Sequence, residues 1–321
     1  MGETMRYSRQ ELILGEAGQT KLEQAKVAII GLGALGSVSS QLLARAGLGQ
    51  ILVIDRDKVE LSNLQRQLLY GENDVGKAKA QIGATRLSNI NSEIQVEGVV
   101  TDLNYKNIDL LEGYDLILDC SDNLYTRYLI NDFASKHKIP WIYSAAVKDY
   151  GNVYLHKPGK ACFACLFEDQ GIALDTCETS GVLSPLTSII ASIQAEYAID
   201  YLRGKNIDEK LLHFDLADMS INKIKPSQRK ACKACAEDYE YLDGKKELQQ
   251  IHYRCSRAYE FFQAELNFPE LKSKLSKLGT VKGDAKHLFF ENLSVFDNGR
   301  VMIKAESMEQ AKAELAKYIG V

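Results

Sequence analysis

The stretch that decides the fold runs from Lys26 to Asp55 and reads KVAIIGLGALGSVSSQLLARAGLGQILVID. A short apolar, β-branched run is followed by a glycine-rich turn and then by apolar residues at helical spacing. A second apolar run closes the stretch and ends in an acid. This order predicts a strand–turn–helix–strand unit, which is the repeating element of nucleotide-binding sheets.

The alternation of strands and helices continues beyond this unit. Apolar runs predict strands at 93–100, 115–120 and 141–146, and helical spacing predicts helices over 75–90 and about 123–137. Strands alternating with helices form a mostly parallel sheet that is covered on both faces. The fold class is therefore α/β, a Rossmann-like doubly wound sheet.

The pattern changes from about residue 149. Ser184 and Pro185 predict a helix start, with serine as N-cap and proline at the first helical position, and Gly204 predicts its end. The runs at 211–219 and 221–226 predict two antiparallel strands. These elements indicate an antiparallel part added to the sheet.

A second module follows. The charged segment 237–247 predicts a linker, so we expect domains over 1–244 and 245–321. The pair Asn298-Gly299 predicts a hairpin, and a helix is predicted close to the last residue. The C-terminal module is therefore a small α+β extension whose role the sequence leaves open.

Composition excludes several classes of protein. The chain has 321 residues, of which 45% are hydrophobic and 26% charged, and its net charge is −4. These values are ordinary for a globular protein, and there is no basic stripe for nucleic acid. No apolar run approaches the ~20 residues that span a bilayer, and the N-terminus has no secretory signal. We expect a cytoplasmic protein that binds neither nucleic acid nor membrane.

The glycine-rich turn indicates a phosphate site. Gly31, Gly33 and Gly36 lie between a predicted strand and helix, where backbone amides approach a phosphate at a helix N-terminus. Asp55 ends the next strand, where an acid binds ribose hydroxyls. The alternative is that the glycines only permit close packing of helix and strand, but that does not account for Asp55.

Charged residues favour ATP over a dinucleotide. Arg66 in the segment SNLQRQ (62–67), Lys77 and Lys79 place cations at the end of the sheet that binds ligands, and Asp122 is an acid suited to Mg²⁺. Each charge alone is more simply a solvated loop residue. An NAD-dependent oxidoreductase is one alternative, which explains the glycines and Asp55 but none of the cations.

Two cysteine pairs indicate a metal. Cys162 and Cys165 form one CxxC pair, and Cys232 and Cys235 form another. Four thiolates make a closed, structural zinc site, which here would clip two distant segments together. A single CxxC would also suit a redox pair, but two of them favour Zn²⁺.

The odd number of cysteines, seven, argues against a disulfide framework. Cys120 lies in an apolar strand and is most simply a core residue. Cys255 has no obvious partner. Cys177 lies in an irregular stretch and is either a nucleophile or simply exposed.

The motifs together resemble those of the MoeB/ThiF/HesA family, the prokaryotic relatives of ubiquitin-activating enzymes. The resemblance covers about residues 5–240. It is carried in order by RYSRQ (6–10), GLGALG (31–36), DRDKVELSNLQRQ (55–67), VGKAKA (75–80), DCSDN (119–123), CFAC (162–165), TCETSGVLSP (176–185) and CKAC (232–235).

The resemblance implies an adenylyltransferase that uses Mg-ATP to activate the C-terminal glycine of a ubiquitin-fold sulfur carrier. That carrier would be MoaD- or ThiS-like and end in Gly-Gly. A homodimer is also implied. Because the chain has no rhodanese domain, the sulfur donor would be separate, either a cysteine desulfurase or a rhodanese. Molybdopterin, thiamine and tRNA thiolation remain open as destinations.

The resemblance also implies roles by matched position. Gly33 and Ala34, the latter a glycine in many relatives, would lie against the nucleotide, and Asp55 would bind the ribose. The phosphates would be held by Asn63, Arg66 and Lys79, and Asp122 would serve the metal and the transition state. Arg9 would enter the partner's ATP site, and Cys177 would take part in sulfur transfer. Two further functions stay open. One is activation of a ubiquitin-like modifier for protein conjugation, and the other is a non-catalytic, zinc-stapled nucleotide-binding scaffold.

Overall fold

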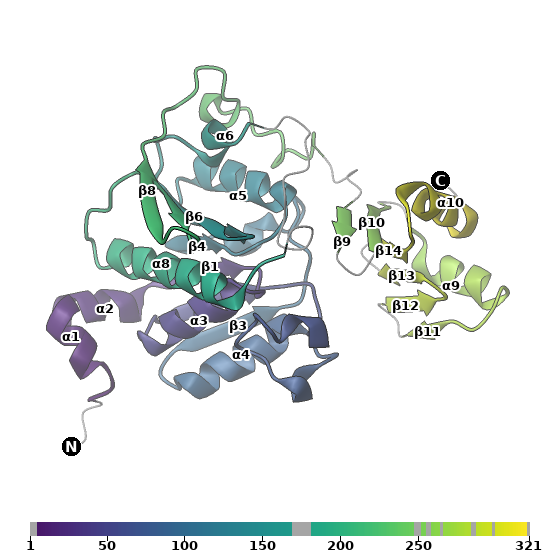
Figure 1. Cartoon of the computed structure of the whole chain (residues 1–321), viewed down its shortest axis with the longest axis horizontal. Coiled ribbons are helices and arrows are strands. Elements are labelled where there is room, and N and C mark those ends of the chain that lie inside the picture. The colour runs from purple at the N-terminus through teal and green to yellow at the C-terminus, as the bar shows by residue number, and fades with distance from the viewer. Residues whose placement is uncertain are drawn as a thin grey trace. The chain divides into compact units, whose positions relative to one another are not determined.

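The computed structural model describes residues 5–168, 181–246, 252–254, 258–263, 266–283, 287–296 and 299–319 (Figure 1). The chain divides into two compact units, Met1–Lys246 and Glu247–Val321. Cys177 and Cys255, two of the cysteines considered above, lie outside the described residues. None of the described helices is long and apolar enough to cross a membrane.

The first unit is built on a sheet whose eight described strands have the order β3-β2-β1-β4-β5-β6-β7-β8. The strands are β1 (Lys26–Ile30), β2 (Gln50–Ile54), β3 (Gln95–Val99), β4 (Leu116–Asp119), β5 (Trp141–Val147), β6 (Tyr150–His156), β7 (Leu211–Asp215) and β8 (Ser220–Ile224). Strands β3, β2, β1, β4 and β5 are parallel to one another. Strands β6, β7 and β8 are added by antiparallel pairing. The predicted α/β fold with an added antiparallel part is confirmed.

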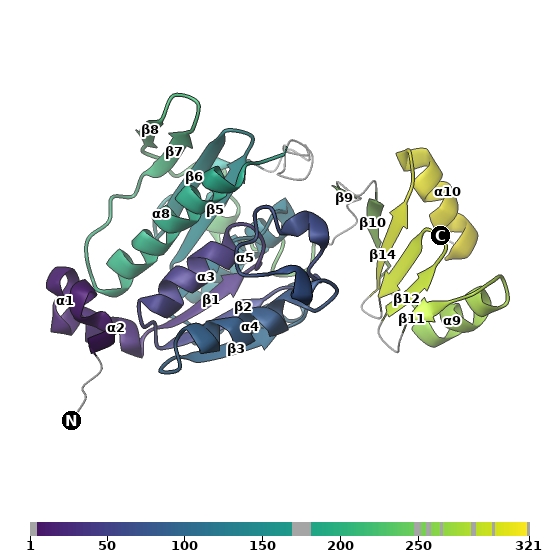
Figure 2. The ribbon, with the colours of Figure 1, turned by 60° about the horizontal axis from the view of Figure 1, so that its bottom comes forward.

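The carboxyl ends of the central strands meet at one edge of the sheet. Ile30 of β1 pairs in register with Ile54 of β2 and with Asp119 of β4. The chain then leaves β1 and β4 towards opposite faces, because α3 (Gly36–Arg45) and α5 (Leu124–His137) cover opposite sides of the sheet (Figure 2). Ligands of open α/β sheets bind at such a switch point.

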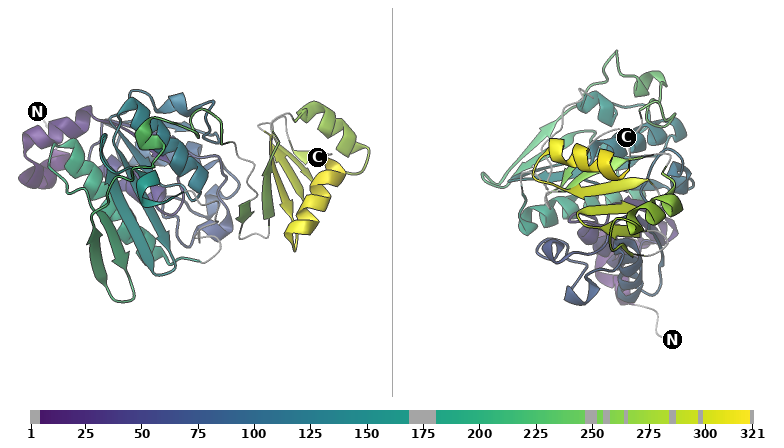
Figure 3. Two further views of the ribbon diagram at one scale, coloured as in Figure 1. Left: turned by 90° about the horizontal axis from the view of Figure 1, so that it is seen from above. Right: turned by 90° about the vertical axis from the view of Figure 1, so that its right-hand side faces the viewer.

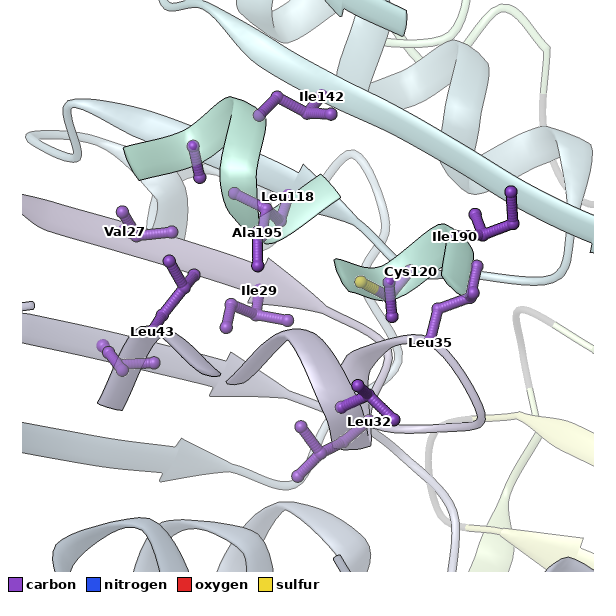
Figure 4. Packing of buried hydrophobic residues seen from close by; sticks show 14 of the residues in the cluster. Val27, Ile29, Leu32, Leu35, Leu43, Leu118, Cys120, Ile142, Ile190 and Ala195 are labelled. Atoms are coloured by element: carbon purple, nitrogen blue, oxygen red, sulfur yellow. The ribbon is translucent and has the colours of Figure 1, made fainter. Parts of the chain in front are cut away.

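The remaining helices of this unit are α1 (Ser8–Leu14), α2 (Glu16–Gln24), α4 (Lys79–Ile90), α6 (Phe163–Leu166) and α8 (Ser184–Leu202), with 3₁₀ turns η1 (Met5–Tyr7), η2 (Leu61–Asn63), η3 (Glu72–Asp74), η4 (Ile108–Leu111) and η5 (Ala234–Ala236). Helices α3, α4 and α8 share one face of the sheet (Figure 2). Leu35, Cys120 and Ile190 are among the side chains of their common core (Figure 4). Cys120 is therefore a core residue, as predicted.

Two predicted helix starts are wrong. Helix α4 begins at Lys79 rather than at 75, because Gly76 has a φ of 88° and Lys58 pairs with Ala78 in an antiparallel bridge. Helix α8 takes Leu183 rather than Ser184 as its N-cap, and no side chain caps it. Its predicted end is confirmed, since Gly204 follows the last turn with a φ of 88°.

The predicted linker over 237–247 is wrong as far as Lys246, because that segment packs on α5. The ring of Tyr241 stacks on Tyr128 with centroids 4.9 Å apart. The backbone N–H of Tyr241 donates to Asp132 Oδ2 at 2.9 Å. The charged composition predicts a linker, but the aromatic side chain of Tyr241 packs the segment on α5.

Asp132 gives this contact a pH dependence. Burial raises the pKa of Asp132 from 3.8 to about 7, although backbone donors from Tyr241 and Leu242 oppose the shift. A raised folded-state pKa contributes stability that is complete below the unfolded value and lost as pH rises through the folded one. We therefore expect Asp132→Asn, which keeps the shape without the charge, to gain stability relative to the parent between about pH 4 and 7. Urea denaturation across that range measures it, and a constant difference between the two proteins would contradict it.

The second unit is an antiparallel sheet in the order β11-β12-β13-β14-β10-β9. Its elements are β9 (His252–Arg254), β10 (Ala258–Phe262), α9 (Phe268–Ser276), β11 (Lys282–Gly283), β12 (His287–Phe290), β13 (Leu293–Phe296), β14 (Arg300–Lys304) and α10 (Met308–Tyr318). Helices α9 and α10 cover one face of the sheet and share its core (Figure 3). Strands β13 and β14 form the predicted hairpin, with Gly299 at a φ of 87° in its turn.

Candidate active site

The three glycines of the loop between β1 and α3 have different reasons to be glycine. A Cβ on Gly31, whose φ is 87°, would lie 2.7 Å from the carbonyl oxygen of Cys120, and one on Gly36 would lie 2.0 Å from that of Gly31. A Cβ on Gly33 would meet only the amide nitrogen of Gln67, at 3.8 Å. Packing therefore explains Gly31 and Gly36, whereas Gly33 leaves its backbone open to a ligand at the start of α3.

This difference predicts two separate phenotypes. Gly36→Ala should destabilise the protein by about 1–3 kcal/mol or more, because backbone atoms would have to move. Gly33→Ala should change stability by less than about 1 kcal/mol. It should nevertheless weaken ATP binding about tenfold, since a methyl group would stand where the ligand approaches. Urea denaturation and calorimetric titration separate the two effects, and unchanged ATP affinity in Gly33→Ala would exclude a ligand at this position.

The carboxylate of Asp55 is hydrogen-bonded to the backbone of the glycine loop. Its Oδ2 accepts a hydrogen bond from the backbone of Leu32 at 2.7 Å, and its Oδ1 accepts one from Asp57 at 2.7 Å. Burial raises the pKa of Asp55, while the charge of Lys79 and the two backbone donors oppose that shift. The carboxylate is thus fixed beside the loop, in the place expected for a ribose-binding acid.

Lys79 is brought to the same edge by the strand-like pairing that shortens α4. Its backbone N–H donates to the carbonyl of Asp57 at 2.9 Å, and its Nζ lies 3.7 Å from Asp57 Oδ2. The side chain is 7% exposed. The hydroxyl of Tyr70 lies 2.9 Å from Leu32 O and 3.4 Å from Lys79 O, which connects the glycine loop to the start of α4. The structure therefore brings together the glycine loop, Asp55 and Lys79.

The segment SNLQRQ forms a turn around η2. Asn63 is buried, and its Oδ1 accepts from the backbone of Glu60 at 3.2 Å. Arg66 is half-buried and donates from Nη1 to Ser62 O at 3.1 Å. Gln67 is 4% exposed, and its Oε1 has no hydrogen-bond partner among the described residues. A buried amide oxygen that has no partner among the described residues, on a side chain beside Gly33, is a feature of a site that takes a polar ligand.

The turn after β4 reaches the loop from the other side. Asp119, at the end of the strand, is fully buried, and its Oδ2 lies 3.3 Å from Arg127 Nε. Burial raises the pKa of Asp119, and the Arg127 charge and hydrogen bonds from Ser121 and Arg127 oppose part of the shift. Asp122, three residues on, is exposed. Its turn touches the loop through the contact of Gly31 with Cys120.

Arg9 is not brought to this edge within one chain. It is exposed on α1, and α1 is held at the opposite edge of the sheet. There the neighbouring Gln10 donates to Ala46 O at 2.8 Å, just before β2 begins (Figure 2).

The four CxxC thiols converge as predicted. Sγ atoms of Cys162, Cys165, Cys232 and Cys235 all lie within 4.8 Å of one another. Neighbouring pairs are separated by 3.5–3.7 Å. Zinc with four bonds of about 2.3 Å to sulfur gives a tetrahedron with edges of about 3.8 Å. The donor set and its spacing therefore fit a structural zinc ion.

The surroundings of these thiols support that assignment. The backbone N–H of Arg229 donates to Cys165 Sγ at 3.4 Å. Burial and the neighbouring thiols raise the pKa of Cys162, and they raise that of Cys235 to about 11. The pKa of Cys165 is lowered instead, because hydrogen bonds from the backbone of Arg229 and Cys162 outweigh its burial. Without a cation Cys162 and Cys235 therefore keep their protons, which a metal would displace.

Comparisons with known proteins identify the family. The model of the ThiF family matches residues 7–235. The chain belongs to the ThiF family. The sulfur carrier protein ThiS adenylyltransferase of Bacillus subtilis is 41% identical, over 99% of this chain and all of that protein. The molybdopterin-synthase adenylyltransferase of Escherichia coli is 35% identical, over 73% of this chain and 97% of that protein.

A solved structure has a similar fold over most of this chain. The crystal structure of E. coli MccB with ATP superimposes with a TM-score of 0.65 at 26% identity, covering 73% of this chain and 74% of MccB. The B. subtilis relative matches 99% of the chain, so its match includes the second unit, which starts at Glu247.

Sequence reasoning missed several residues of this edge. Asp57, Gln67 and Asp119 lie inside motifs that were used to recognise the family, so their positions were visible but not their contacts. Tyr70 and Arg127 lie outside every one of those motifs. Only the folded chain places them against the glycine loop and the turn after β4.

Proposed function

We propose that this chain is an adenylyltransferase that uses ATP to activate the C-terminal carboxylate of a ubiquitin-fold sulfur carrier. The observation that carries the proposal is the meeting of the glycine loop, Asp55 and Lys79 at one sheet edge, in a chain that belongs to the ThiF family. Among carriers we propose the ThiS type. A relative that matches over both units, from B. subtilis, is a ThiS adenylyltransferase.

Each side chain of the edge has a role that suits its position. Backbone amides at Gly33 and Ala34 and the N-terminus of α3 would receive phosphate oxygens. Asp55 would accept hydrogen bonds from the ribose. The phosphates would be held by the amide of Asn63 and the cations of Arg66 and Lys79, which neutralise the charge on pyrophosphate as it leaves.

The reaction needs little from the protein besides position and charge. A carboxylate oxygen of the carrier's last glycine attacks the α-phosphorus, and the bond from that phosphorus to the bridging oxygen of pyrophosphate breaks. The products are the acyl-adenylate and pyrophosphate. The nucleophile is already an anion, so no general base is required. Mg²⁺, which Asp122 would hold, would offset the phosphate charges.

A homodimer would complete the site. Arg9 shares α1 with Leu12 and Ile13, which are 79% and 77% exposed. We propose that this helix covers a second copy and places Arg9 in its ATP site. Mixing Arg9→Ala and Lys79→Ala chains should then restore about a quarter of the parental activity, since half of the dimers carry one intact site. No restoration after verified exchange of subunits would exclude a shared site.

Zinc and sulfur complete the proposal. Zn²⁺ would be held by the four clustered cysteines and have a structural role, because no ligand position remains open. Such thiolates suit a reducing compartment, and we propose the cytoplasm. Sulfur would come from a separate donor, and Cys177 would take part in its transfer. Unchanged thiocarboxylate formation in Cys177→Ala would remove that role.

The second unit would serve the carrier or its sulfur donor as a docking module. A chain without residues 247–321 tests this role. If its affinity for the carrier is unchanged, the second unit serves stability alone.

ATP–pyrophosphate exchange with a panel of carriers ending in Gly-Gly from the same cell tests the function. Exchange that depends on the ThiS-type carrier is the expected result. Exchange with another carrier would redirect the pathway or indicate activation of a protein modifier. ATP binding without exchange, from zinc-loaded protein and every carrier, would favour a non-catalytic scaffold.

A further inference from the structure

The exposed carboxylate of Asp122 sits on a turn that is unusually well fixed. The turn begins after Asp119, and Asn123 ends it as the N-cap of α5, where its Oδ1 accepts from Thr126 N at 2.8 Å. Ser121 is bound from two sides. Its backbone N–H and its hydroxyl donate to Asp119 Oδ1 at 2.9 and 2.5 Å, and its carbonyl accepts from Arg127 Nη2 at 2.6 Å.

Asp119 and Arg127 form one buried unit behind this turn. Asp119 is fully buried and Arg127 is 12% exposed, with Nε 3.3 Å from Asp119 Oδ2. The guanidinium lies over the ring of Tyr143, 5.1 Å from its centroid, which restricts it further. The carbonyl of Asp119 accepts from Gln194 Nε2 and Ser144 Oγ, both at 3.0 Å. The strand end is therefore tied to β5 and to α8.

The arrangement is costly for a purely structural purpose. A buried ion pair contributes little net stability, because desolvating both charges offsets their attraction. Its geometric effect is more specific. Asp119 holds the N–H side of Ser121 and Arg127 holds its carbonyl, so both peptide groups before Asp122 are fixed. The opposite charges also cancel, so Asp119 adds no net negative charge beside the phosphates.

We propose that Asp119 and Arg127 are positioning residues for adenylation, which act by holding the turn that presents Asp122 to the metal-bound nucleotide. The proposal rests on the proposed function and extends it to two residues behind the site. Neither touches the substrate. A turn fixed before the ligand arrives places the Asp122 carboxylate without reorganisation in the transition state.

A double-mutant cycle separates this role from general support of the fold. Removing one charge would leave the other buried and unpaired, so the neutral pair Asp119→Asn/Arg127→Gln is the informative variant. It is combined with Asp122→Asn. The neutral pair should lower kcat of carrier-dependent exchange about 10- to 100-fold and change the KM for ATP less than about threefold. In the Asp122→Asn background the same change should cost less than about threefold, because residues that act as a unit are not additive.

A matched control exists at the end of α8. Asp200 and Arg203 form an ion pair with an Nη2–Oδ1 distance of 2.7 Å, and their side chains are 10% and 20% exposed. Asp200→Asn/Arg203→Gln should leave the exchange rate within about twofold of the parent. Zinc content and thermal unfolding establish that each variant is folded. If the neutral pair does not fold, Arg127→Lys replaces it, since lysine keeps the charge but cannot reach Ser121 O and Asp119 together.

Three outcomes would overturn the proposal: parental kcat in the neutral pair, equal losses in both Asp122 backgrounds, or an equal loss in the control pair. Failure of the proposed function is a different result, namely no exchange by the parent with any carrier. In that case calorimetric binding of ATP with and without Mg²⁺ replaces exchange. Asp122→Asn and the neutral pair should reduce the gain in affinity with Mg²⁺ by the same factor, and a gain reduced in Asp122→Asn alone would overturn the positioning role.

Discussion

Replacing Lys79 with alanine should reduce carrier-dependent ATP–pyrophosphate exchange about 10²- to 10³-fold. A preorganised cation that meets charge developing in the transition state contributes on this scale. Lys79 suits that role because it is buried at the first turn of α4, with Nζ 3.7 Å from Asp57 Oδ2. That ion pair holds the cation beside the glycine loop in the absence of ligand.

The fold should survive this substitution. The backbone of Lys79, not its side chain, makes the 2.9 Å hydrogen bond to Asp57 O, and alanine is favourable in a helix. Lys58→Ala is a suitable control, because Lys58 is an exposed cation on the segment that pairs with Ala78. Its exchange rate should stay within about twofold of the parent. A rate in Lys79→Ala above a third of the parental one would exclude a phosphate role for this lysine.

The sequence predicted the framework of this site because the framework is local. The apolar run 26–30, the glycine loop and the helix that follows are adjacent in the chain, and their pattern alone predicts their structure. The edge that they form is then a consequence of parallel pairing, which places Ile30 beside Ile54 and Asp119. The position of Asp55 at this edge follows directly from that register, because Asp55 comes next after Ile54.

What the sequence could not predict depends on contacts between distant segments. The two acids of the motif DCSDN lie in different environments, since Asp119 is buried against Arg127 and Asp122 is exposed. Their shared motif does not distinguish them, because burial depends on where β4 ends and where α5 turns back. The predicted start of α4 was wrong for the same reason, because the bridge between Lys58 and Ala78 overrides the helical pattern of the sequence.

Removing the metal should have the second large effect, on stability rather than on chemistry. Cys162→Ser should lose bound zinc and lower the melting temperature of the first unit by about 10 °C. That shift corresponds to about 4 kcal/mol at the 2–4 °C per kcal/mol typical of a domain of this size. The reason is geometric, because the cluster joins the start of α6 to η5 across a separation of 70 residues.

The consequences should spread along α5. Phe163 of α6 donates its backbone N–H to Asn131 Oδ1 at 2.8 Å, and its ring lies 5.2 Å from that of Tyr128. Tyr128 in turn stacks on Tyr241, so loss of the metal should loosen both the 162–167 and the 237–246 segments. Hydrogen exchange of those backbone amides measures the change directly, with little change expected in β1 and β2.

Cys120→Ala provides the comparison, since it removes one thiol that is buried outside the cluster. It should keep one equivalent of zinc and lose only the stability expected of a small core truncation, about 1 kcal/mol. Metal analysis of both variants, together with melting of the parent after a strong chelator, decides the matter. If the parent has the same melting temperature with and without the chelator, the four converging thiols do not stabilise this fold through a metal.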